Sequence, residues 1–136
     1  MIEVAGLNAA AGEVCYTGID LFEARPHEDA RGLTLRAAHR LLKPTGARIR
    51  LVPGDPLTAL SRVANTLTGS ELVVISADQD ADSLGRAWFY LPRMLVRDSL
   101  VLMEVPGGPD GEPAIRSIDR DEIDRLARPP ALRRAA

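Results

Sequence analysis

The sequence predicts an α/β protein, a three-layer sandwich in which helices cover both faces of a mostly parallel sheet. Apolar runs alternate along the chain with stretches of helical spacing, and the runs at 72–75 and 100–103 are unbroken. Unbroken apolar runs are typical of strands that are buried on both faces. With 136 residues, 46% of them apolar, the chain is long enough for one globular domain. We expect this domain to span residues 1–128, followed by a disordered tail at 129–136.

The first half of the chain predicts three helices and two strands. Residues 2–11 favour a helix, and a strand over 14–19 ends at Asp20. After a polar loop, helical spacing over 30–43 stops at Pro44, because proline cannot continue a helix. A strand over 48–52 and a turn at Gly54 follow. Asp55 can then cap a helix that has Pro56 at its first position and continues to residue 67.

The second half continues the alternation. Strands are predicted near 72–76 and 99–104, with a helix over 83–94 between them that Pro92 terminates or kinks. The glycine- and proline-rich stretch 106–113 predicts a turn. Residues 113–118 can return as an antiparallel strand, and a last helix capped by Ser117 or Asp119 extends to Ala127.

Composition excludes several classes of protein. The net charge of −2 argues against a nucleic-acid binder that relies on a basic surface. One cysteine forms no internal disulfide, and two histidines form no zinc cluster. The pair Asp78 and Asp80 is a weak metal signal, so we expect no metal site. The sequence has no apolar run of membrane-spanning length, and we expect no signal peptide because the N-terminus lacks a basic start and a long apolar core. The chain is therefore expected to be cytoplasmic.

Carboxylates and small residues follow each predicted parallel strand. They are Asp20 after the first, Gly54 and Asp55 after the second, Ser76 and Asp78 after the third, and Glu104 in the last. Ligands bind at the carboxyl ends of strands in open parallel sheets, because loops and helix N-termini converge there. A carboxylate in the position of Asp20 can accept both hydroxyls of a ribose. The alternative is local: Asp and Ser are also common helix caps and turn residues.

Other chemically active side chains have ordinary structural interpretations. His39 is expected on a helix surface, His27 in a solvated loop, and Cys15 as an inert buried thiol within a strand. Three consecutive aromatic residues, 88–90, cannot all face the core of one helix-covered domain. At least one of them is expected under a loop or at an interface, which favours a homodimer.

The stretch 16–104 resembles the class I S-adenosylmethionine-dependent methyltransferases, especially the small O-methyltransferase and macrocin-methyltransferase-like branch. The family's strand end "GID" corresponds here to Gly18-Ile19-Asp20, and its "GD" turn corresponds to Gly54-Asp55. Its "DLVYIDGDH" strand corresponds to the stretch 71–79, and its "GGxLVxxD" strand corresponds to the stretch 98–104. The resemblance implies a truncated Rossmann-like methyltransferase fold. It further implies an S-adenosylmethionine site that includes Asp20, Gly54, Asp55 and Ser76, and methyl transfer to a small-molecule hydroxyl with Asp78 as the candidate base.

The chain departs from this family in two places. The glycine-rich turn of the family's first strand is missing, so the sequence begins one strand late. The family's "DGDH" becomes Ser76-Ala77-Asp78-Gln79, which removes one carboxylate and the histidine and argues against metal-assisted transfer. Two hypotheses stay open: an S-adenosylmethionine-dependent methyltransferase-like domain, or a catalytically inactive derivative that serves as a binding or self-association module. With the first strand absent, the strand from Tyr16 pairs with the strand from Leu72 or leaves a gap that a partner fills.

Overall fold

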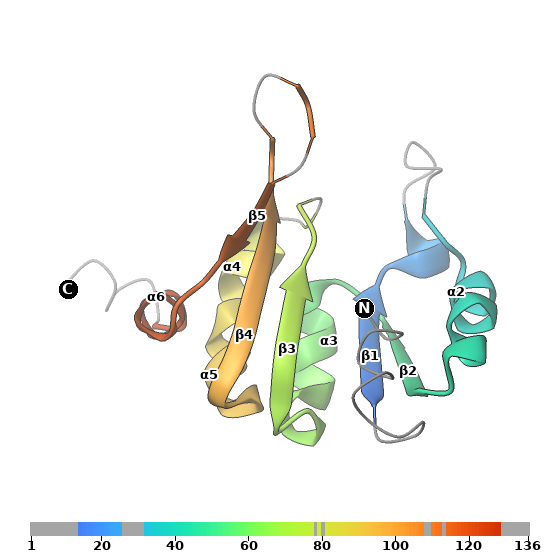
Figure 1. Ribbon diagram of the computed structural model, residues 1–136, viewed down its shortest axis with the longest axis horizontal. Coiled ribbons are helices and arrows are strands. Elements are labelled where there is room, and N and C mark those ends of the chain that lie inside the picture. Colours follow the sequence, from blue (N-terminus) through green and yellow to red (C-terminus); the bar gives the residue numbers. More distant parts are fainter. Residues whose placement is uncertain are drawn as a thin grey trace. The chain divides into compact units, whose positions relative to one another are not determined.

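The computed structural model describes residues 14–25, 32–77, 79, 81–107, 110–112 and 114–128. It is a mixed α/β structure with parallel strand pairs (Figure 1). The chain divides into two compact units, Met1–Asp55 and Pro56–Ala136, and each is described separately below. The predicted helix at 2–11 and the predicted tail at 129–136 lie outside the described residues.

The first unit is built on one parallel strand pair. Strand β1 (Cys15–Asp20) pairs with β2 (Arg48–Pro53), in a register that runs from Cys15 opposite Arg48 to Asp20 opposite Pro53. Parallel neighbours need a crossover connection, and helix α2 (Leu35–Leu42) lies on it. Thr34 caps this helix, since its side chain accepts a hydrogen bond from the N–H of Ala37 over 3.1 Å.

The second unit contains a three-stranded sheet in the order β3-β4-β5. Strand β3 (Ser70–Ile75) is parallel to β4 (Leu95–Val105), and β5 (Ala114–Ser117) is antiparallel to β4. Helices α3 (Pro56–Val63), α4 (Ala81–Ala87) and α5 (Leu91–Met94) lie behind this sheet in Figure 1. Helix α6 (Arg120–Leu126) follows β5, with Asp119 as its N-cap.

The core of the second unit forms between the helices and one face of the sheet. Ile75 and Val101, on neighbouring strands, are 8% and 1% exposed. The helices contribute fully packed side chains, among them Ala59, Leu60, Val63, Ala87, Trp88, Leu91 and Met94. Because side chains alternate along a strand, the other face of the same strands carries Leu72, Val74 and Leu100, which are 43%, 51% and 43% exposed.

Several predicted elements are confirmed with small shifts at their ends. The strands at 15–20, 48–53 and 70–75 agree with the sequence prediction, as do the antiparallel return at 114–117 and the last helix. The helix predicted over 83–94 is divided into α4, a 3-10 turn at Trp88–Tyr90, and α5. Pro92 lies in the first turn of α5, where its missing N–H leaves no hydrogen bond unmade.

One expectation requires correction: Cys15 is exposed rather than a buried thiol. Within the units, β1 pairs with β2 and β3 pairs with β4. Pairing of the strand from Tyr16 with the strand from Leu72 stays a prediction. The expectation that the three aromatics do not all face the core is confirmed, because Trp88 is 4% exposed and Phe89 is 51% exposed.

Candidate functional site

The carboxyl ends of β1 and β2 bring Asp20 and Gly54 together. The N–H of Gly54 donates a hydrogen bond to the backbone oxygen of Asp20 over 2.8 Å. Gly54 adopts a φ of 144°, a conformation that side chains other than glycine rarely allow. The glycine therefore permits the tight turn that places Asp55 directly after this strand end.

The carboxylate of Asp20 is held by Arg25. A guanidinium nitrogen of Arg25 donates to Oδ2 of Asp20, and the two side chains are 15% and 35% exposed, respectively. A carboxylate offers about four acceptor positions, so this ion pair leaves acceptor capacity for a ligand hydroxyl. The pair therefore orients a negative charge at the rim of the sheet.

A strained residue lies between the two partners. Phe22 has a φ of 50°, in the left-handed region that bulky side chains avoid, and its side chain is 6% exposed. Such strain persists only where surrounding contacts stabilise it, and it is concentrated at functional sites. Burial of the Phe22 ring thus supports the short 3-10 turn Phe22–Ala24 that carries the chain from Asp20 to Arg25.

The remaining predicted residues belong to the second unit or lie outside the described residues. Ser76 is exposed and directly follows β3. Since Ile75 pairs with Met103, Ser76 and Glu104 lie at the same end of the β3-β4-β5 sheet. Asp78, the candidate base, lies outside the described residues, as do Asp80 and His27.

Two shallow depressions occur elsewhere on the described surface. One, of about 440 Å³, is lined by Leu35, Arg36, His39 and Leu51 in the first unit. The exposed His39 lies on the helix surface, as predicted. The other, of about 280 Å³, lies where the ends of β4 and β5 meet α6 and includes Arg97, Ser99 and Arg120. Neither contains a residue predicted for the site.

Sequence reasoning missed Arg25. The available signal was its position five residues after Asp20, across a short turn, which is close enough for an arginine to reach back to the carboxylate. The described residues contain no group of three or more His, Cys, Asp or Glu side chains that could hold a metal ion. In the same part of the chain, no helix is long and apolar enough to span a membrane.

Comparisons with family models, curated proteins and solved structures found no match to this chain.

Proposed function

We propose that this chain is a methyltransferase-like domain that binds the nucleoside part of S-adenosylmethionine at the carboxyl end of β1 and β2. The single observation that supports this proposal most is the meeting of Asp20 with the Gly54 turn, 2.8 Å apart through their backbones. Asp20 would accept the ribose hydroxyls while Arg25 holds its carboxylate in position. Gly54 and Asp55 would flank the base.

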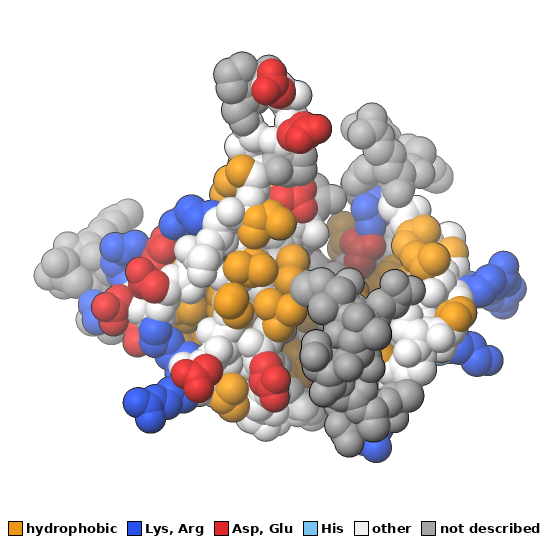
Figure 2. All heavy atoms as spheres, in the orientation of Figure 1, with side chains coloured by type: hydrophobic (Ala, Val, Ile, Leu, Met, Phe, Trp, Pro, Cys, Tyr) orange, Lys and Arg blue, Asp and Glu red, His pale blue; other side chains and the backbone are white. Residues whose placement is uncertain are grey.

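If the domain is catalytic, the methyl group passes in line from the sulfonium to a small-molecule hydroxyl. The sulfur–methyl bond breaks as the oxygen–methyl bond forms, and the hydroxyl proton passes to a base, for which Asp78 is our candidate. The sulfonium is already an activated donor, so positioning supplies most of the rate acceleration. The second candidate function is a catalytically inactive self-association module, which the exposed Leu72 and Val74 of β3 favour. Figure 2 shows a hydrophobic patch at the centre of this view.

Calorimetric titration with S-adenosylhomocysteine tests the binding proposal. We expect saturable heat for the wild-type protein, and an affinity weaker by about 1–3 kcal/mol for Asp20→Ala, which is the contribution of a hydrogen bond to a charged group. Asp98→Ala is the matched control, because Asp98 is an exposed carboxylate on β4. Its affinity should equal that of the wild type.

Asp20→Asn separates ligand contact from folding, since the amide keeps an acceptor oxygen of the same shape. Circular dichroism of each variant shows whether the fold is retained. Absence of heat and of any thermal shift for the folded wild-type protein would reject the nucleoside site. Equal weakening by the Asp20 and Asp98 substitutions would show that binding depends on general charge rather than on the β1–β2 rim.

A further inference from the structure

The guanidinium of Arg25, which holds Asp20, lies directly against Gly32. A Cβ atom added at Gly32 would collide with Nε and Cζ of Arg25 and would lie 2.6 Å from one of its terminal nitrogens. Both residues belong to the first unit. Because glycine has no side chain, Gly32 leaves the space that this guanidinium occupies.

The position of Arg25 is limited at both ends of its guanidinium. The side chain is only 15% exposed, and its Nε atom is buried. A terminal nitrogen donates to the carboxylate of Asp20, while Nε and Cζ lie against Gly32. The nitrogens of a guanidinium form a planar, rigid fork. A shift at the Gly32 side therefore moves the nitrogen that holds Asp20.

A second contact joins the same two segments of the chain. Glu23 lies in the 3-10 turn between Asp20 and Arg25, and its Oε1 accepts a hydrogen bond from the N–H of Leu35 over 2.8 Å. Leu35 is the first residue of α2, where an N–H group has no acceptor within its own helix. The turn that carries Arg25 is thus attached to the beginning of α2 through Glu23 and lies against Gly32 just before that helix.

We propose that Gly32 is a positioning residue for the Asp20–Arg25 ion pair, and that a side chain at this position moves Arg25 away from Asp20. The guanidinium is the far end of a flexible side chain, so it yields more easily than the backbone around it. Asp20 then keeps its place in β1 but loses the contact that orients its carboxylate. The effect on ligand affinity rests on the proposed nucleoside site, whereas the placement of Arg25 does not.

Nuclear magnetic resonance of the Arg25 Nε–H group tests the placement without a ligand. Because Nε is buried, its proton should exchange slowly with water, and Arg25→Lys identifies the signal by removing it. Gly32→Ala should shift this signal and bring its exchange rate close to that of exposed arginines. The midpoint of urea unfolding should change little, since the flexible side chain gives way.

Thr34→Ala is the matched control for Gly32→Ala. Thr34 caps α2 by accepting a hydrogen bond from the N–H of Ala37, so its replacement weakens the start of the same helix and introduces no new atom. This variant should lower the midpoint of urea unfolding and leave the Arg25 signal unchanged. The two substitutions thus separate a loss of helix stability from a displacement of Arg25.

Calorimetric titration with S-adenosylhomocysteine connects the placement of Arg25 to the candidate site. Gly32→Ala should weaken binding about fivefold, because a loose Asp20 side chain has to be ordered when the ligand binds. In an Arg25→Ala background the same substitution should have no further effect, since the side chain that it displaces is gone. Thr34→Ala should bind as the wild type does.

Two variants of Glu23 test the proposal by a second route if Gly32→Ala does not fold. Glu23→Ala removes the acceptor of the Leu35 N–H, so it should shift the Arg25 signal. Glu23→Gln keeps an acceptor oxygen and should retain the wild-type signal. Circular dichroism shows which variants are folded. If Glu23→Ala is folded and its Arg25 signal is unchanged, the turn does not depend on this attachment and the proposal is overturned.

Three further results would contradict the positioning role. They are an unchanged Arg25 signal in folded Gly32→Ala, an affinity equal to that of the wild type despite a shifted signal, and a loss of affinity of the same size in the Arg25→Ala background. If the wild-type protein does not bind S-adenosylhomocysteine, the proposed nucleoside site is rejected. The Arg25 signal then still decides whether Gly32 positions the ion pair.

Discussion

The backbone N–H of Leu57 donates a hydrogen bond to Oγ of Ser83 over 3.1 Å. Leu57 lies in the first turn of α3, where N–H groups have no acceptor within their own helix. Ser83 belongs to α4 and is 8% exposed. A side chain of one helix therefore caps the start of another, and the pair joins α3 to α4 in the second unit.

Ser83→Ala should destabilise the protein by about 1–2 kcal/mol. The substitution leaves the Leu57 N–H in a partly buried position without this acceptor, and such a group carries its full desolvation penalty. Urea unfolding followed by circular dichroism measures the change. Ser61→Ala is the control, because Ser61 is exposed and its hydroxyl donates only to the Thr58 carbonyl of its own helix. Equal effects of the two substitutions would contradict the role of Ser83 as a cap.

The neighbouring aromatics Trp88 and Phe89 should respond to truncation very differently. Trp88 is 4% exposed, so Trp88→Ala should cost about 3–5 kcal/mol through lost burial and the resulting cavity. Phe89 is 51% exposed and interacts with Tyr90 at a ring separation of 5.2 Å and with the Arg93 guanidinium at 4.9 Å. Phe89→Ala should therefore cost less than about 1.5 kcal/mol.

Tryptophan fluorescence offers a direct check on this assignment. Trp88 is the single tryptophan of the chain, so all indole emission reports on one buried position. Iodide should quench it weakly in the native protein and strongly in urea. Strong quenching before unfolding would place Trp88 at the surface and contradict the described packing.

Two glycines should show opposite effects when replaced by alanine. Gly69 has a φ of 86°, and an added Cβ would meet no atom within 4 Å. Gly69→Ala should therefore destabilise by about 1 kcal/mol from backbone strain alone. Gly85 also has open space around the Cβ position, but it lies inside α4. Gly85→Ala should stabilise by about 0.5–1 kcal/mol. Thermal unfolding of both variants in the same buffer measures the two changes in stability. If both substitutions stabilise the protein, or both destabilise it, this interpretation is rejected.

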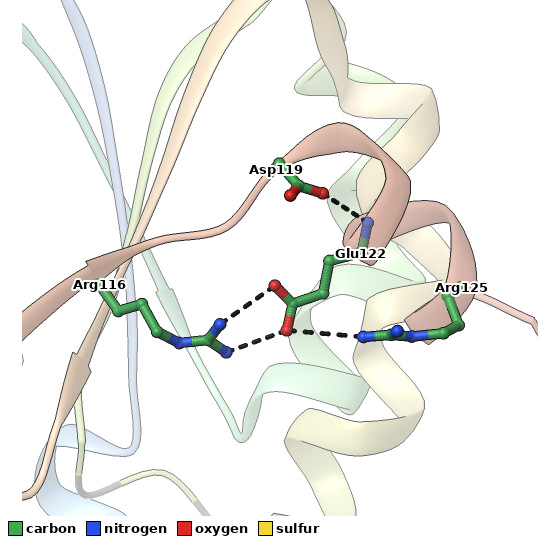
Figure 3. A network of polar contacts seen from close by, with 4 residues as sticks. All are labelled: Arg116, Asp119, Glu122 and Arg125. Carbon is green, nitrogen blue, oxygen red and sulfur yellow. Dashed lines mark hydrogen bonds and ion pairs between the residues drawn. The ribbon is translucent and has the colours of Figure 1, made fainter.

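The ion pairs around Glu122 should contribute to the stability of the protein in a way that depends on salt but does not change with pH near neutrality. Glu122 accepts hydrogen bonds from both terminal nitrogens of Arg116, at 3.1 and 3.0 Å, and lies 3.8 Å from Arg125 (Figure 3). The hydrogen bond and charge of Glu122 raise the pKa of the Arg116 guanidinium. A raised pKa of a basic group means that its stabilising contribution is present below its unfolded value and lost only as strongly alkaline pH passes the folded value.

Glu122→Gln should accordingly produce a small loss of stability at low ionic strength that shrinks as salt is added, because Arg116 and Arg125 are exposed and Glu122 is partly exposed. Urea unfolding at two salt concentrations measures the difference. Asp98→Asn, which removes an exposed charge from β4, is the control. A loss that is independent of salt would show that Glu122 acts through packing rather than through charge.

The candidate site was predictable in part. The sequence placed Asp20 and Gly54 at strand ends, because a β-rich run followed by an acid or a Gly-Asp turn is a local signal. It did not indicate Arg25 as the partner of Asp20, since that contact depends on the conformation of the intervening turn. The turn requires Phe22 to adopt a φ of 50°, and the conformational preferences of phenylalanine do not predict this value.

Hydrophobic periodicity and the positions of capping residues, glycine and proline by themselves predicted the α/β class, the order of the strands along the chain, and a last helix capped by Ser117 or Asp119. These features depend on interactions between residues near in sequence, where alternation, capping and proline each act locally. Only the tertiary structure decided that Arg25 holds Asp20, that Leu100 lies beside Leu72, and that Leu72 and Val74 remain exposed on β3. An apolar strand has the same sequence whether or not a neighbour covers it, because burial depends on what the rest of the chain places against it.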